Sequence, residues 1–403
     1  LEKFPESKAT LLKAIEILHQ FEDLSSLRID ALFALSLTER RLGNYANAVQ
    51  TLQEACATAE TRNLSEKHVR ALYNLGTAQE EMGNREEART TYDKALHLAR
   101  VHRLDSEEMS ILEREGDLFA AEANFDMAIQ SFSAALKLAR ELKDEVKVAS
   151  LLQKTAVNYY APGNYTAALE LLDEAIEITG RLEGDELTEV SVRLAHASVL
   201  MQQRRFSEAV PEFRALADFE RKTSATTHTG LMMLAFTYEQ MAEYRDAEKT
   251  LDKMLRRARN KRDVESQAWA YLGLGRLRIR QQQHARALSD LQTALRLADD
   301  QKNRDTAASA NKFLGIAMAG TGDVDAGRLA IQKSVNLFRD LGKPYEMSDA
   351  MVTLAELEAL VGNYKQAIDA YQAALTEQKR LQSDEAANVI NGMGMVLMKA
   401  GKT

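Results

Sequence analysis

The sequence predicts an all-α solenoid, in which one helix–turn–helix unit recurs along the whole chain. The first observation behind this is composition: 403 residues contain only four prolines, and Ala, Leu, Glu, Gln, Lys, Arg and Met dominate. These residues lose the least free energy on entering a helix. Aromatic residues make up 6% of the chain, so the core is expected to consist mainly of Leu, Ala and Met. The second observation is a short motif that returns about every 40 residues.

The motif is clearest at Gly43-Asn44-Tyr45-Ala46-Asn47-Ala48, and it closes at Gly362-Asn363-Tyr364-Lys365-Gln366-Ala367. Its last position falls at Ala48, Ala88, Ala128, Ala168, Ala209, Ala247, Ala287, Gly327 and Ala367. The steps between these positions are 40, 40, 40, 41, 38, 40, 40 and 40 residues. Such regular spacing indicates tandem copies of one structural unit.

Three positions around the motif predict how the helices pack. A small residue stands twelve positions before the final Ala, as at Gly76 and Gly116, and a large apolar one stands four positions after it, as at Tyr92 and Phe132. Another small residue generally follows at seven positions, which places it on the same helix face. Small residues allow two helix backbones to approach, and the large residue fills the gap. The Gly-Asn pair is expected to form the turn, since both residues tolerate positive φ.

Each unit is therefore predicted to be a helix A, a turn and a helix B. In the second unit helix A is expected at about Ser65–Met82 and helix B at about Glu86–Val101. Nine full repeats would occupy residues 23–382. Residues 1–22 would hold a lone helix B (Ala9–Gln20), and residues 383–403 a lone helix A. Because the chain opens at Leu1 and both ends fall within a repeat, we expect a fragment of a longer protein.

The small residue, the Gly-x-Tyr turn, the Ala and the following large residue resemble the tetratricopeptide repeat (TPR) signature over essentially the whole chain. The 40-residue spacing is similar to that of Pins/LGN-type polarity adaptors, bacterial Rap proteins and the TPR arms of regulatory ATPases. The resemblance implies a right-handed superhelix with a concave groove. It also implies that helix A residues line the groove and that the groove binds an extended or helical peptide.

Carrying over the inward-facing TPR positions gives a candidate partner-binding patch in units five to eight. Methionine and tryptophan adapt to apolar side chains, and tryptophan and arginine are frequent at binding hot spots. The patch would suit a peptide with apolar anchors beside acidic residues; alternatively, its side chains pack within the superhelix. Its members are Met201, Met232, Phe236, Glu239, Trp269, Leu272, Arg276, Arg280 and Lys312.

A secondary groove is predicted in the N-terminal third, where the inward positions are polar and acid-leaning. Its members are Arg70, Tyr73, Glu113 and Asp117. The carboxylate clamp of chaperone-binding TPR proteins requires Lys or Arg and Asn at two of these positions in successive units. Other residues stand there, for example Tyr73 and Thr77, which argues against binding of an acidic chaperone tail.

Composition and motifs narrow the function classes. The formal charge of -8 argues against a nucleic-acid partner. Nine basic residues between Arg256 and Arg286 could form a nucleic-acid or phosphate site, or a solvated helix end that complements the helix dipole. The histidines show no metal-ligand spacing, no catalytic motif appears, and no cofactor is implied. One cysteine, Cys56, favours a reducing compartment and a cytoplasmic location, and no apolar run is long enough for membrane insertion.

The sequence therefore favours a non-enzymatic scaffold or adaptor that binds a protein or peptide partner. Two alternatives stay open: a ligand- or peptide-sensing arm of a larger regulator, and an architectural rod in a cytoskeletal or ciliary assembly. The oligomeric state is left open.

Overall fold

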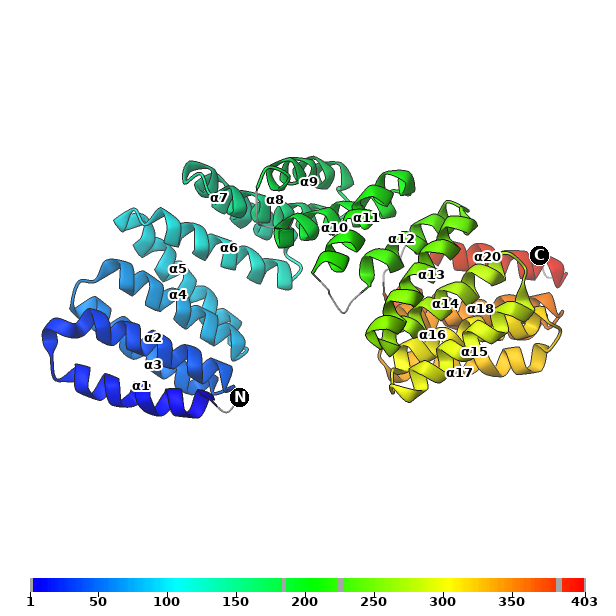
Figure 1. Ribbon diagram of the computed structural model, residues 1–403, viewed down its shortest axis with the longest axis horizontal. Helices are drawn as coiled ribbons and strands as arrows, with labels where there is room; N and C mark the ends of the chain where they lie inside the picture. The colour runs from blue at the N-terminus through cyan, green and yellow to red at the C-terminus, as the bar shows by residue number, and fades with distance from the viewer. Residues whose placement is uncertain (1–2, 183–185, 224–227, 382–385, 402–403) are drawn as a thin grey trace. The chain divides into compact units, whose positions relative to one another are not determined.

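The computed structural model describes residues 3–182, 186–223, 228–381 and 386–401. Within these residues the chain forms twenty α-helices and one short 3₁₀ helix, and no strand (Figure 1). The all-α solenoid predicted from the repeat is thereby confirmed. The helices divide into two compact units, residues 1–199 and 200–403, and the boundary falls within α10.

The first unit contains α1 to α9 and most of α10. Their bounds are α1 (Lys3–His19), η1 (Glu22–Leu24), α2 (Ser25–Arg41), α3 (Tyr45–Thr61), α4 (Ser65–Glu81), α5 (Arg85–His102), α6 (Asp105–Ala121), α7 (Phe125–Glu141), α8 (Glu145–Tyr160), α9 (Tyr165–Thr179) and α10 (Glu186–Gln202).

The second unit contains the end of α10 and ten further helices. Their bounds are α11 (Phe206–Lys222), α12 (Thr229–Gln240), α13 (Tyr244–Lys261), α14 (Val264–Arg280), α15 (His284–Asp300), α16 (Arg304–Gly320), α17 (Val324–Asp340), α18 (Pro344–Leu360), α19 (Tyr364–Arg380) and α20 (Ala386–Lys399).

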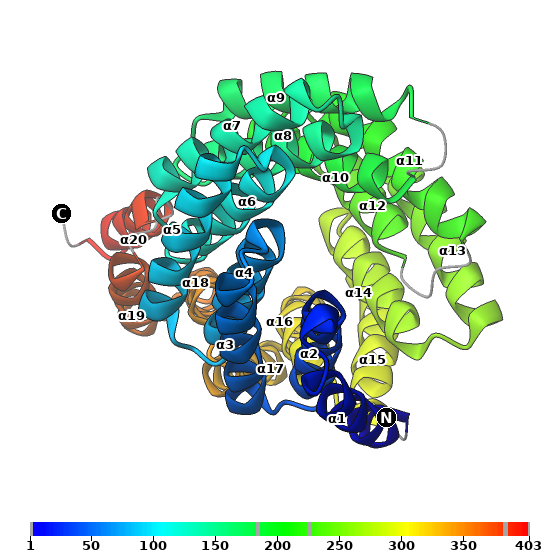
Figure 2. The ribbon, with the colours of Figure 1, turned by 90° about the vertical axis from the view of Figure 1, so that its left-hand side faces the viewer.

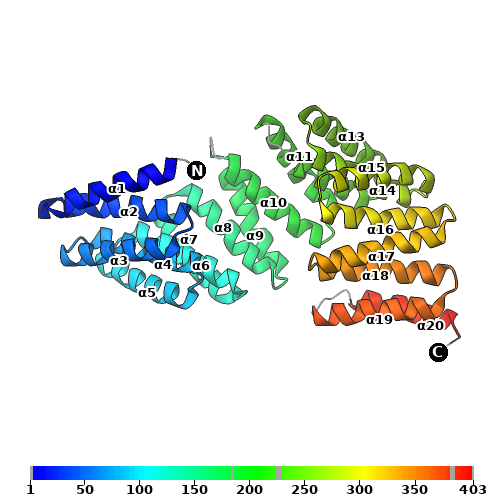
Figure 3. The ribbon, with the colours of Figure 1, turned by 90° about the horizontal axis from the view of Figure 1, so that it is seen from below.

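Most connections are turns of about three residues, so successive helices run antiparallel and pack side by side. In the first unit, α4, α6 and α8 form one layer and α5, α7 and α9 the other (Figure 2). In the second unit, α16, α17, α18 and α19 follow one another as neighbouring rows (Figure 3). The even-numbered helices are the helix A elements of the repeat.

The predicted pairing of small and large residues sets the packing within each repeat. A Cβ atom at Gly76 would lie 2.6 Å from Cε1 of Tyr92, and one at Gly116 would lie 2.5 Å from Cε1 of Phe132. Gly275 and Gly315 have the same relation to Leu291 and Ile331. The large partners are fully buried. Each glycine therefore allows helix B to approach helix A so closely that the large side chain lies on the bare backbone.

Of the two turn residues expected to adopt positive φ, only the glycine does so. The glycine adopts positive φ, as at Gly43 (76°) and Gly163 (91°). The asparagine does not: Asn164 has a φ of -81°, and its side chain accepts a hydrogen bond from the backbone N–H of Ala167. The correction has a simple reason, because this asparagine is the N-cap of helix B and relieves an unpaired N–H of the first turn. Where glycine is absent, Ala123 or Gln282 adopts the left-handed conformation.

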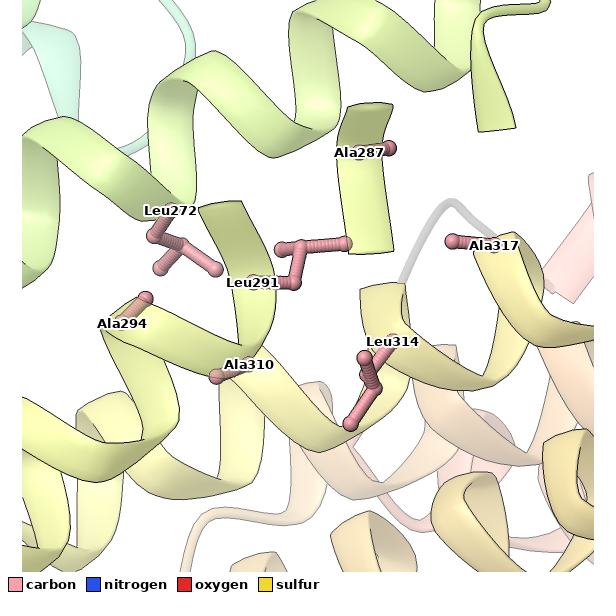
Figure 4. Close-up of a cluster of buried hydrophobic side chains, with 7 residues drawn as sticks. All are labelled: Leu272, Ala287, Leu291, Ala294, Ala310, Leu314 and Ala317. Atoms are coloured by element: carbon pink, nitrogen blue, oxygen red, sulfur yellow. The ribbon is translucent and has the colours of Figure 1, made fainter. Parts of the chain in front are cut away.

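The core runs along each unit as a series of small clusters between adjacent helices. Figure 4 shows one of them, in which α14, α15 and α16 each contribute a leucine and the alanines come from α15 and α16. Its members are Leu272, Ala287, Leu291, Ala294, Ala310, Leu314 and Ala317. Because each cluster involves only neighbouring helices, stability is expected to be roughly a sum of local terms.

Candidate partner-binding groove

Two cavities lie between α12 and α14 in the second unit. The first has a volume of about 180 Å³ and is lined by Met232, Met233, Ala235, Phe236 and Glu239 of α12, by Leu251 of α13, and by Trp269, Leu272, Gly273 and Arg276 of α14. The second has about 350 Å³ and is lined by His228, Thr229, Met232, Met254, Asp263, Glu265, Ser266 and Trp269. Since Met232 and Trp269 line both, we treat the two cavities together as the α12–α14 groove.

The walls of the first cavity are mainly apolar. Met232, Phe236 and Trp269 are half-buried, so each presents part of its side chain to the cavity. Leu272 is only 1% exposed and belongs to the core cluster of Figure 4, so it forms the floor rather than an accessible anchor. Gly273 also lines the cavity, and a Cβ there would lie 2.8 Å from Cδ2 of Leu251, which lines it too.

An ion-pair cluster lies at one end of this cavity. Glu239 is almost fully buried, with 3% of its side chain exposed. Its Oε2 accepts a hydrogen bond from Nε of Arg276 and its Oε1 accepts one from Nε of Arg280, both at 2.8 Å. The Arg276 guanidinium also lies 5.2 Å from the ring centre of Phe236 and 6.0 Å from that of Phe313. Two cations thus share one carboxylate, which leaves a net positive charge at this end.

Three residues of the predicted patch lie outside the lining of the groove: Arg280, which pairs with Glu239 at its end, and Met201 and Lys312. The sulfur of Met201, at the end of α10, accepts a hydrogen bond from the Thr237 hydroxyl of α12 at 3.3 Å. The ammonium of Lys312 forms an ion pair with Asp349 and lies 4.6 Å from the ring centre of Phe313. Both side chains join neighbouring helices instead of lining either cavity.

The secondary groove predicted in the first unit separates into two different features. Arg70 and Tyr73 line a cavity of about 220 Å³ between α4 and α6, together with Ser106 and Ser110. Glu113 and Asp117 do not line it.

Glu113 and Asp117 are instead engaged by lysines of α8. Lys147 donates to Glu113 at 2.7 Å, and Lys154 lies 2.9 Å from Glu113 and 2.8 Å from Asp117. Burial alone would raise the pKa of Glu113, but the bonds from Lys147 and Lys154 outweigh it and hold this pKa below its usual value. The carboxylates that made this surface look acidic in the sequence are therefore neutralised within the protein.

The basic cluster between Arg256 and Arg286 is also partly used internally. Arg278 forms an ion pair with Asp290, and Arg257 donates to the backbone carbonyl of Ala217 at 3.3 Å. Arg259 donates to the hydroxyl of Tyr271. Together with the pairing of Arg276 and Arg280 by Glu239, these contacts leave fewer free cations than the sequence suggests.

Sequence reasoning missed several residues of the groove, among them Met233, Gly273, Asp263 and Glu265. They fall outside the inward positions carried over from the repeat. A signal was present in the short spacing of 38 residues before Ala247, because α12 has 12 residues where most of the other helices have 17. The second cavity lies where α12 begins, beside the start of α14.

Neither a metal centre nor a membrane span is found in the part of the chain that the structure describes. No group of three or more His, Cys, Asp or Glu residues there is arranged to hold a metal ion. None of the helices described combines the length and the apolar character needed to cross a membrane.

The stacked helix pairs, with a small residue facing a large one and a glycine turn in between, define a TPR protein. The family model described as the MalT-like TPR region matches residues 2–305, and the chain belongs to this family. A second model, anaphase-promoting complex subunit 5, matches residues 328–398 near the C-terminus. No curated protein matches the sequence.

Solved structures show the same fold at low sequence identity. The apo form of RapI is 15% identical, with a TM-score of 0.56 over 68% of this chain and 99% of RapI. A signal-transduction ATPase with a TPR sensor from Pyrococcus horikoshii is 12% identical, with a TM-score of 0.56 over 91% of this chain. This chain spans about half (54%) of the length of that ATPase. At such identities the likeness concerns the fold alone.

Proposed function

We propose that this chain is a non-enzymatic interaction scaffold that binds a peptide segment of a protein partner in the α12–α14 groove. The observation that carries the proposal is the apolar cavity lined by Met232, Phe236 and Trp269, with two arginines at its end. Pockets that bury aromatic and methionine side chains beside arginine are typical of binding hot spots. TPR arrays typically act as scaffolds through such surfaces.

The chemistry of the groove suits apolar anchors next to a carboxylate. An anchor side chain would displace water from the walls made by Met232 and Trp269, which yields about 25 cal/mol per Å² of apolar surface buried. A partner carboxylate would meet the excess positive charge of Arg276 and Arg280. Met201 and Lys312 would support the groove from neighbouring helices, and the cavity at Arg70 and Tyr73 would be a second, more polar contact.

A second candidate function is a sensing arm of a larger regulator. The observation that favours it is the match to the ATPase from Pyrococcus horikoshii, whose TPR part is described as a sensor. A sensor must change its helix arrangement on binding, whereas a scaffold need not. Hydrogen exchange that slows only in α12 to α14 on binding would favour the scaffold. Protection that spreads to distant helices would favour the sensor.

The groove is tested by comparing the wild-type chain with Met232→Glu as bait in native extract, with mass spectrometry as the readout. The substitution places a charge between the two cavities, so we expect the partners to be lost. Arg276, the less exposed of the two arginines, is left unchanged because it neutralises the buried Glu239. The matched control is Met127→Glu, the same change at a 39% exposed methionine of the first unit.

The proposal holds if partners bind the wild type and Met127→Glu but not Met232→Glu, and if cross-links from the captured partner map to α12 and α14. Circular dichroism must show that both variants remain equally helical. Partners that bind all three baits alike would place the binding surface elsewhere and refute the groove.

A further inference from the structure

The α12–α14 groove carries opposite charges at its two ends. Its residues on α14 follow one another along the helix: Asp263 caps the N-terminus, Trp269 lies at the middle, and Arg276 lies near the C-terminal end. Thirteen residues separate Asp263 from Arg276, which corresponds to roughly 20 Å along a helix. The groove therefore has a direction that a bound segment can follow.

Carboxylates dominate the first end. Asp263 and Glu265 both line the second cavity. Asp263 accepts a hydrogen bond from the backbone of Ser266 at 3.0 Å, and its other oxygen lies 3.4 Å from Nδ1 of His228. Glu265 is exposed and accepts a hydrogen bond from the Asn303 amide at 3.1 Å. No lysine or arginine of the described chain lines this cavity, so this end favours a cation.

The other end favours an anion. The buried carboxylate of Glu239 balances only one of the two guanidinium groups bound to it. Arg280 is exposed, and about half of its side chain is open to solvent. A ligand carboxylate that reaches Arg280 would complete the neutralisation of the cluster.

The middle of the groove is apolar. Met232 and Trp269 stand between the two cavities. The first cavity, at about 180 Å³, corresponds to the volume of about six water molecules. A cavity of this volume admits single side chains but not a whole α-helix, which is about 10–12 Å wide with its side chains. An extended chain that follows α14 would place successive side chains along the groove.

We infer that the α12–α14 groove binds an extended peptide segment of mixed charge: a basic side chain at one end, apolar side chains in the middle and an acidic side chain at the other. This rests on the proposed function, and it adds the charge order and length of the ligand. At about 3.3 Å per residue, 20 Å corresponds to roughly six residues. The basic residue lies against Asp263 and Glu265, and the acidic residue against Arg276 and Arg280.

The test uses four end-blocked, fluorescently labelled hexapeptides with the same four apolar residues in the middle. Their terminal residues are Lys and Glu, Lys and Lys, Glu and Glu, or Gln and Gln. Binding to the full chain is measured by fluorescence anisotropy. The mixed Lys/Glu peptide is expected to bind tightest, by roughly three- to tenfold over the others, because each end contributes a partly exposed ion pair.

Charge reversal in the groove must then switch the preference. In Glu265→Lys the first end loses its negative excess, so the affinity of the Glu/Glu peptide should rise relative to that of the mixed Lys/Glu peptide. In Arg280→Glu the second end becomes negative while Arg276 still neutralises Glu239, so the Lys/Lys peptide becomes the best ligand. Both residues are exposed, so each variant is expected to fold, as circular dichroism would verify.

The outcomes separate this inference from the proposed function. If the four peptides bind equally well and Met232→Glu abolishes all of them, the charge order is wrong and the groove stands. If no peptide binds, or if Met232→Glu does not affect binding, the inference is overturned; the proposed function is then judged by the capture experiment alone. A preference that switches with both charge reversals supports the inference.

Discussion

The contact between Gly116 and Phe132 determines how closely α6 and α7 pack. It could be predicted from the sequence, because both residues stand at fixed distances from the repeated Ala128. Phe132 is 1% exposed, so its ring is covered by neighbouring atoms. Gly116→Ala would place a Cβ 2.5 Å from its ring. We expect the free energy of unfolding to fall by about 1–3 kcal/mol, measured by urea unfolding with far-ultraviolet circular dichroism.

Gly394→Ala is the control for this prediction. Gly394 lies within α20, and a Cβ there would meet no heavy atom within 4 Å. Removing the flexibility of glycine from an open helix position should raise the stability by about 0.5–1 kcal/mol. If both variants shifted the urea midpoint in the same direction, close packing at Gly116 would not be the cause.

Glu115 makes the stability of the first unit depend on pH. It is 8% exposed, and burial, aided by the charge of Asp93, raises its pKa from 4.5 to about 7. The folded state therefore binds the proton more tightly than the unfolded chain. Stability should be highest below about pH 4.5 for this group, and should fall by up to about 3 kcal/mol as the pH rises to about 7.

Glu115→Gln carries no ionisable group, so this decline should disappear and the variant should be more stable than the wild type at pH 8. Urea midpoints measured from pH 5 to pH 8 test this. The exposed Glu170 offers the control, and Glu170→Gln should keep the wild-type profile. An unchanged slope in Glu115→Gln would assign the pH dependence to another group.

At the scale of the helices, the repeat predicted both helices of the second unit to within one residue, but it placed the start of the first helix at Ala9, whereas α1 begins at Lys3. Helix A of the second unit was expected at Ser65–Met82 and is α4, Ser65–Glu81. The 38-residue spacing signalled an irregular unit here, but it did not show that α12 would begin at Thr229, where its first turn packs against α11. Glu220 of α11 accepts a hydrogen bond from the backbone of Gly230, and a Cβ at Gly230 would lie 2.4 Å from the Ala217 nitrogen.

The ion pairs between neighbouring helices could not be predicted from the sequence either, because the partners of Glu113 and Asp117 stand more than 30 residues later in the chain. Lys154 serves both carboxylates and joins α6 to α8. Lys154→Met would leave Asp117 with only Arg114, at 3.9 Å. We expect a loss of about 1–3 kcal/mol in the free energy of unfolding.

Lys312→Met provides the comparison, because Lys312 pairs with a single carboxylate, Asp349, whose side chain is 56% exposed. Exposed pairs contribute less than about 1 kcal/mol. Thermal unfolding of both variants checks the difference. If Lys154→Met lost no more stability than Lys312→Met, the second carboxylate engaged by Lys154 would be energetically unimportant.

At the scale of the whole molecule, the sequence predicted which side chains share a cavity better than it predicted which of them are exposed. The repeat register brought Met232, Phe236 and Trp269 to one cavity, because inward positions recur with each helix A. It could not tell that Leu272 is covered, since its burial depends on Leu291 and Leu314 of later helices. The exposure of a side chain depends on the helices of adjacent repeats that pack against it, and the pattern within one repeat does not describe those helices.

The chain divides into two compact units, and this predicts that the groove survives without the first one. Among the described helices, substantial contacts join only neighbours and next-neighbours along the chain. A fragment of residues 186–403 keeps α10 whole and retains every residue that lines the α12–α14 groove. In a solenoid the loss of distant repeats removes only one interface. We therefore expect this fragment to be helical and to capture the same partners as the full chain.

The fragment of residues 1–182 should fold but capture none of the partners that depend on Met232. Circular dichroism reports folding, and capture with mass spectrometry reports binding, with Met232→Glu introduced into the 186–403 fragment as the control. If residues 186–403 fold and do not bind, the first unit must supply part of the site. If they do not fold, then stability is not local, and the solenoid behaves as one cooperative body despite its contact pattern.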